Sequence, residues 1–210
     1  MRIGIMLAAA QLLWAQTPPA VKEPQGLPAR AAPSDYQAQA KVGAFTIAAD
    51  FTGHGIPNEG EALNSEDHVA VEIGIFGEPG AHLTITASEF SLRINGKKEA
   101  LPSRQWGLVA KNIKDPNWAP PEAEEGQKSK GGFGTGGQQA GSPPPLPPKP
   151  PIELLRNWQQ RLKRAALAEG DRALPQAGLL FFPYRGKAES IKSVELIYAG
   201  PAGNATLALQ

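Results

Sequence analysis

Cysteine is absent from this chain of 210 residues, and histidine occurs only 3 times. Without a thiol, disulfide scaffolds, cysteine nucleophiles, iron–sulfur sites and thiolate zinc sites are all excluded. Aromatic residues are scarce at 7%, whereas glycine (23) and proline (21) are abundant, which excludes coiled coils, collagen and polytopic membrane proteins. Neither charge sign dominates, because 21 Lys and Arg face 20 Asp and Glu, so we expect no nucleic-acid partner.

Long apolar runs are missing outside the N-terminus. Residues 3–14 form an apolar run behind the positive charge of Arg2, and Ala15 is a small residue before a polar, proline-bearing stretch. A membrane-spanning helix needs about 20 residues, so this run is too short to cross a membrane. The pattern is typical of a secretory signal peptide over residues 1–15, with a buried N-terminal helix as the alternative. We therefore expect a secreted or periplasmic bacterial envelope protein with no transmembrane segment.

Changes in composition divide the rest of the chain into five segments. Residues 16–35 are rich in proline and poor in large apolar side chains, which predicts a disordered leader. Residues 36–115 are predicted to form the first part of a β-sandwich, and residues 171–210 the strands that complete it. Between them we expect a flexible Gly/Pro-rich linker over 116–151 and an amphipathic helix over 152–170. The proline run of the linker is interpreted as a spacer or, alternatively, as a ligand for an aromatic groove.

Alternation of apolar and polar side chains predicts the strands. Apolar side chains recur at every second position at Phe45, Ile47, Ala49 and Phe51, and again at Val69, Val71, Ile73 and Ile75. The dipeptide Asn95–Gly96 predicts a two-residue hairpin with a type I′ turn. Phe181 and Phe182 are neighbours in one later strand, so we expect that strand to be covered on both faces. Short strands at this spacing predict a mainly β fold, an antiparallel immunoglobulin-like β-sandwich.

Several of these strands carry a family resemblance. Residues 69–75 read Val-Ala-Val-Glu-Ile-Gly-Ile, and residues 89–97 read Glu-Phe-Ser-Leu-Arg-Ile-Asn-Gly-Lys. Residues 178–182 and 193–198 follow in the same order as Gly-Leu-Leu-Phe-Phe and Ser-Val-Glu-Leu-Ile-Tyr. This series resembles the telokin-like, immunoglobulin-like domains of bacterial secreted proteins and lipoproteins. The resemblance implies the sandwich fold and export, and it implies no catalytic residue.

The segment 152–169 changes to a helical period. Leu155, Trp158 and Leu162 fall on one face, and charged residues such as Arg161 surround them. We expect this apolar stripe to pack against the chain's own sandwich, since the next strand follows closely. In the alternative interpretation, these four residues bind an envelope protein, or the helix makes a peripheral contact with an anionic envelope surface.

The segment 50–72 is acidic and contains no Lys or Arg. Its side chains favour a solvated loop, but they also offer the oxygen ligands that a hard divalent cation prefers. The candidate metal ligands in this alternative are Glu59, Glu61, Glu66, Asp67 and His68. Their spacing fits no calcium loop and no H-E-x-x-H zinc motif. The alternative function is therefore a small-ligand-binding or metal-binding periplasmic protein that uses this loop.

Catalytic motifs are missing from the sequence. No G-x-S-x-G elbow occurs, and the glycine run at 131–137 leads into prolines instead of a phosphate-binding helix. A pair of carboxylates for glycoside hydrolysis can be drawn anywhere in the acidic loop, so it indicates nothing specific. We therefore predict no catalytic residue and no cofactor. The predicted function is an exported noncatalytic module with an interaction or structural role in the bacterial envelope.

Overall fold

A computed structural model of the protein describes residues 25–57, 62–119 and 149–210. Strands prevail among these residues, and every strand ladder is antiparallel, so the predicted mainly β fold with antiparallel sheets is confirmed. Four predicted segments lie wholly or partly outside the described residues. The undescribed parts are the signal peptide (1–15), the leader up to residue 24, residues 58–61 of the first part of the sandwich, and residues 120–148 of the linker.

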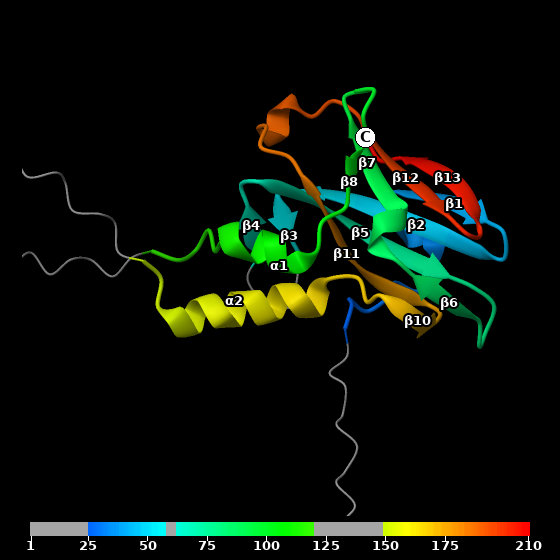
Figure 1. Ribbon diagram of the computed structural model, residues 1–210, viewed down its shortest axis with the longest axis horizontal. Coiled ribbons are helices and arrows are strands. Elements are labelled where there is room, and N and C mark those ends of the chain that lie inside the picture. The colour runs from blue at the N-terminus through cyan, green and yellow to red at the C-terminus, as the bar shows by residue number, and fades with distance from the viewer. Residues whose placement is uncertain (1–24, 58–61, 120–148) are drawn as a thin grey trace, which may run out of the picture.

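Two four-stranded sheets make up the body of the molecule (Figure 1). The first sheet has the order β1 (Ala38–Val42), β2 (Phe45–Gly53), β5 (His68–Phe76), β11 (Gln176–Pro183). The second sheet has the order β13 (Gly203–Ala208), β12 (Val194–Gly200), β7 (Phe90–Ile94), β8 (Leu101–Pro102). Side chains from both sheets share one hydrophobic core, in which Ile47, Ile73 and Leu196 are fully buried.

Smaller elements surround these sheets. A three-stranded sheet contains β3 (Gly55–Ile56), β4 (Leu63–Ser65) and β9 (Ile113–Lys114), and a two-stranded ribbon pairs β6 (His82–Ile85) with β10 (Gly170–Ala173). The α-helices are α1 (Trp106–Val109) and α2 (Ile152–Ala165). Short 3-10 turns are η1 (Pro33–Asp35), η2 (Ala87–Glu89), η3 (Ala110–Asn112) and η4 (Ala188–Ser190).

The outer face of the first sheet is buried as well. Trp158 and Leu162 of α2 pack with Ala70 of β5 and Phe181 of β11 in a second hydrophobic cluster. Phe182, the neighbour of Phe181, lies in the core between the sheets, so β11 is covered on both faces as expected. The alternation of β5 marks the side chains of the central core, and Ala70 on its opposite face is buried under α2.

The free edge of β11 is also covered. Three backbone amides from distant segments donate to its carbonyl oxygens: Leu27 to Ala177 (3.0 Å), Leu167 to Leu179 (3.0 Å) and Arg104 to Phe181 (2.7 Å). An open edge strand invites pairing with other chains, and these hydrogen bonds satisfy the groups that such pairing would use. The long strand is thereby integrated into the fold on every side.

The helix is shorter than predicted. The sequence favoured a helix over 152–170 with Gly170 as its stop, but α2 ends at Ala165. Ala166 has an extended backbone (ψ 144°), and the amide of Leu167 donates to β11. Gly170 instead adopts a left-handed φ of 91° where β10 begins. The competing backbone pairing with β11 is the physical reason for the early end.

Residues 25–35, predicted as part of a disordered leader, instead lie against the first sheet. The Arg30 guanidinium lies 2.5 Å from Asp50 and 3.1 Å from Glu72, two carboxylates that face each other on β2 and β5. It also stacks over the Tyr36 ring at 4.3 Å. These contacts order a segment whose composition alone predicts disorder.

Candidate functional site

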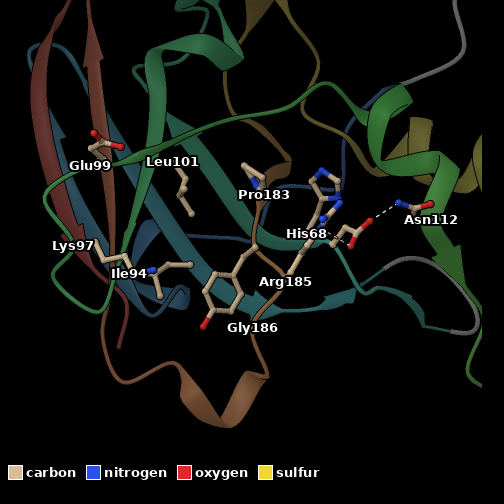
Figure 2. Close-up of a pocket in the computed structure, with 11 residues that line it drawn as sticks. His68, Ile94, Lys97, Glu99, Leu101, Asn112, Pro183, Arg185 and Gly186 are labelled. Carbon is tan, nitrogen blue, oxygen red and sulfur yellow. Dashed lines mark hydrogen bonds and ion pairs between the residues drawn. The ribbon is translucent and has the colours of Figure 1, made fainter.

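A cleft of about 680 Å³ opens where β5 and β8 begin and where β7 and β11 end. Figure 2 shows the side chains of the β7–β8 hairpin on one side of this hollow and those of the segment after β11 across from them. We call it the cleft, and its lining residues are Asp67, His68, Ile94, Lys97, Glu99, Leu101, Asn112, Pro183, Tyr184, Arg185 and Gly186. Four separate segments of the chain thus converge on one hollow.

The turn after β7 has the backbone that its sequence predicts. Asn95 and Gly96 have φ angles of 55° and 63°, and the Lys97 amide donates to the carbonyl of Ile94 at 3.3 Å. Two successive left-handed residues define a type I′ turn, so this turn is confirmed. The Asn95 side-chain amide also donates to the carbonyl of Ser190 at 2.8 Å, which anchors the turn to the loop before β12.

The register after this turn differs from the prediction. In a two-residue hairpin Leu92 would face Glu99, but in the structure it faces Leu101. The predicted two-residue hairpin is therefore wrong, because the chain leaves the ladder after the turn and rejoins it late. The residues left out of the ladder include Lys97 and Glu99, which line the cleft as a result.

The segment after β11 forms the opposite wall. The amide of Tyr184 donates to the carbonyl of Asp67 at 2.9 Å, and its hydroxyl lies 2.8 Å from the hydroxyl of Ser190. The carbonyl of Gly186 lies 2.8 Å from Nε2 of His54. A Cβ atom on Gly186 would come within 2.5 Å of the Tyr184 ring, so this ring lies tightly over the glycine. The wall is fixed by contacts to three other loops.

Two positive and two negative side chains line the cleft. Asp67 already has partners, since one carboxylate oxygen lies 3.1 Å from Nε of Arg185 and the other accepts a hydrogen bond from Asn112. Within the described part of the chain, the side chains of Lys97 and Glu99 have no ion-pair or hydrogen-bond partner, and both are exposed. These two charges are therefore free to meet a ligand.

His68 lines the cleft, and its burial favours the neutral form of the ring. Burial lowers the pKa of its imidazole below the ordinary value, with Asp67 opposing this effect and the cations Arg104 and Arg185 reinforcing it. Its Nδ1 atom is buried and has no hydrogen-bond partner among the residues that the structure describes.

Three of the five candidate metal ligands lie among the described residues. The five were Glu59, Glu61, Glu66, Asp67 and His68, and the first two lie outside the described residues. Glu66 pairs with Lys114 at 2.5 Å, and Asp67 is held by Arg185. Across residues 25–57, 62–119 and 149–210, no three His, Asp or Glu side chains gather as a metal-binding group. Asp67 and His68 do meet, but they do so as lining of the cleft.

The apolar stripe of α2 packs on the chain's own first sheet. Trp158 and Leu162 are 3% and 0% exposed, and Leu155 packs half-buried against the same cluster, with Arg161 half-buried beside them. The expected self-packing is what the structure shows. The alternative in which Trp158 and Leu162 bind a partner is wrong, because both side chains already pack against the first sheet.

The sequence patterns did not identify most of the cleft residues as candidates for a functional site. Only Asp67 and His68 stood out as candidate ligands, and they did so for a metal. The contacts that shape the cleft join distant segments, as between His54 and Gly186, which are 132 positions apart. The one local sequence feature that pointed to the cleft was the Asn95–Gly96 turn, because the residues after it leave the strand ladder.

Comparisons of the chain with protein-family models, with curated proteins and with solved structures found no match. Among the described residues, no helix combines the length and apolar character needed to cross a membrane. The cleft is therefore the feature of the described residues from which we infer a function.

Proposed function

We propose that this protein is a noncatalytic binding module that holds a ligand in the cleft. The cleft itself is the observation that carries the proposal: its volume of about 680 Å³ lies within the roughly 300–1,000 Å³ of typical ligand sites. Such sites combine an apolar lining with a few placed polar groups. Here Ile94, Leu101 and Pro183 supply the lining, and Lys97 and Glu99 supply free charges.

Two observations support binding over catalysis. A general acid or base must reach the proton that it transfers. The Asp67 carboxylate is occupied by Arg185 and Asn112, and the Nδ1 atom of His68 is buried. We therefore assign no acid–base role to Asp67 or His68.

The body that presents the cleft is, in this proposal, an immunoglobulin-like β-sandwich of the telokin-like type. Two four-stranded antiparallel sheets around a shared core support it, as does the order of the resembling strands β5, β7, β11 and β12. The apolar run before Ala15 supports export to the periplasm or beyond. The ligand would then be a small molecule of the envelope or an exposed part of an envelope protein.

A ligand screen by thermal unfolding tests the function. The purified protein is melted with peptides, sugars, nucleotides, organic acids, Ca²⁺ and Zn²⁺, because a ligand that binds the native state raises Tm by mass action. We expect at least one organic class to raise Tm. The rise should shrink in Lys97→Glu and persist in the control Lys98→Glu, whose neighbouring side chain does not line the cleft.

Two results would contradict the proposal. One is a screen in which no class changes Tm. The other is a rise that is the same in Lys97→Glu as in the unaltered protein, which would place the ligand outside the cleft. A rise caused by Ca²⁺ or Zn²⁺ alone would favour the metal-binding alternative instead.

A further inference from the structure

The free charges of the cleft have opposite signs and lie close together in the chain. Lys97 and Glu99 belong to the same loop, both are exposed, and both line the hollow. Across the cleft, Arg185 uses Nε to hold Asp67, and its terminal amino groups have no partner within the described residues. A ligand in the cleft therefore meets an ammonium group, a guanidinium group and an uncompensated carboxylate.

The lining between these charges is apolar. Ile94 and Leu101 come from the hairpin and Pro183 from the end of β11 (Figure 2), and Tyr184 follows directly after it in the chain. Ile94 is almost fully buried, and Leu101 packs on the core between the sheets, so this lining is part of the rigid body. An aliphatic side chain placed here gains by leaving water.

These features favour some ligand classes over others. A nucleotide or free phosphate would gain from Lys97 but would be repelled by Glu99. A fatty acid has an apolar body and a carboxylate, but it leaves the Glu99 carboxylate without a counter-charge. A sugar offers no charge to either side chain. A ligand with an apolar body that carries one positive and one negative charge engages the lining and both free charges.

We propose that the cleft binds a short apolar peptide through both of its free ends. The α-ammonium group pairs with Glu99, the α-carboxylate pairs with Lys97 and Arg185, and the side chains pack on Leu101 and the Tyr184 ring. This inference deepens the proposed binding function and rests on it. Free peptides in the envelope are the source to which it commits, as distinct from a single terminus of an intact protein.

Calorimetric titration with four dipeptide probes tests the inference. The probes are Leu-Leu, N-acetyl-Leu-Leu, Leu-Leu-amide and the doubly blocked N-acetyl-Leu-Leu-amide. We expect Leu-Leu to bind and each blocked end to weaken binding, with acetylation doing so about fivefold, as expected for the loss of one exposed ion pair. The doubly blocked probe should bind most weakly.

Matched variants assign each end of the peptide to its residue. Acetylation should no longer weaken binding in Glu99→Gln, and amidation should weaken it less in Lys97→Met than in the unaltered protein. Lys98→Met serves as the control and should behave like the unaltered protein. Because all three positions are exposed, the variants are expected to fold, and an unchanged melting curve verifies this.

Three results would overturn the inference. In the first, Leu-Leu does not bind, and in the second, the blocked probes bind as tightly as Leu-Leu. In the third, blocking only one of the two ends weakens binding, which would indicate that the ligand is one terminus of an intact protein. If the peptides fail while another class in the thermal screen depends on Lys97, the ligand class is wrong and the binding function stands. If no class binds, both proposals fail.

Discussion

At the scale of single residues, Arg30 has the clearest stabilising role. Asp50 and Glu72 stand opposite each other on β2 and β5, and like charges in such a pair repel. Arg30 lies against both carboxylates and over the Tyr36 ring. Burial lowers the pKa of Arg30, but the hydrogen bonds and charges of Glu72 and Asp50 outweigh it and raise this pKa. One cation therefore both relieves the repulsion and anchors the N-terminal segment to the sheet.

Replacing this cation should destabilise the fold. We expect Arg30→Met to lower the free energy of unfolding by about 1–2 kcal/mol, a value kept modest because the ion pairs are partly exposed. Urea denaturation measures the change. In an Asp50→Asn background the same substitution should lower the free energy of unfolding by clearly less, since a neutral amide then replaces one of the two repelling carboxylates. An equal loss in both backgrounds would show that the repulsion between the carboxylates is unimportant.

His68 gives the fold a pH dependence with a definite sign. Its pKa in the folded protein is lowered by burial, so the neutral form is favoured in the native state. The resulting stability is fully present above the unfolded pKa of about 6.5 and is lost as the pH falls through the folded value. We expect the unaltered protein's stability advantage over His68→Gln to be larger at about pH 7.5 than at about pH 5. Denaturation at both pH values checks this, and an advantage that grows toward acid would contradict it.

At the scale of elements, the covering of β11 depends on a close backbone approach. A Cβ atom on Gly178 would lie 2.5 Å from Cα of Leu167 and 2.7 Å from its amide nitrogen. Backbone atoms cannot move aside as a flexible side chain can. The segment after α2 can therefore pair with β11 only because residue 178 has no side chain.

Adding one methyl group tests this contact. We expect Gly178→Ala to destabilise the protein by about 1–3 kcal/mol, the usual cost of overpacking. The control is Gly107→Ala in α1, where a Cβ atom has nothing within 4 Å, and there we expect no loss or a slight gain. Thermal or urea unfolding compares the two variants. Equal stability of both would mean that the segment after α2 moves freely away from β11.

The role of α2 as a cover for the first sheet is tested in the same way. Leu162 is fully buried, so Leu162→Ala should lower the free energy of unfolding by about 2–5 kcal/mol. Gln159 is exposed on the same helix, and Gln159→Ala should change it by less than about 0.5 kcal/mol. If Leu162→Ala proved as mild as Gln159→Ala in urea denaturation, α2 would not be part of the core.

Particular elements show how far sequence patterns reach. The alternation over β5 predicted which side chains enter the central core, because period two is a property of the strand itself. It did not predict that Ala70 is buried on the other face, since that depends on α2, far away in the sequence. Likewise, the Asn95–Gly96 turn followed from local backbone preferences, whereas the shifted pairing of Leu101 did not. The cleft was missed for this reason, because non-local pairings create it.

At the scale of the whole molecule, the two four-stranded sheets contact each other along both of their edges. β1 lies beside β13, and Arg104, just after β8, pairs with Phe181 of β11. The openings are therefore at the ends of the strands, and the cleft lies at one of them. Of the segments outside the two large sheets, α2 covers the first sheet, and η3, which precedes β9, contributes the cleft residue Asn112. Loops at the ends of the strands thus form the proposed binding surface, as in many binding modules.

The most direct test of the central claim, that the cleft is the binding site, is a map of amide chemical shifts. Two-dimensional ¹H–¹⁵N spectra of the labelled protein are recorded before and after adding the low-molecular-weight fraction of a bacterial envelope extract. We predict shifts at Ile94, Leu101, Tyr184 and Gly186, with Ala70 under α2 unchanged. An unchanged spectrum, or shifts confined to residues outside the cleft, would contradict the claim.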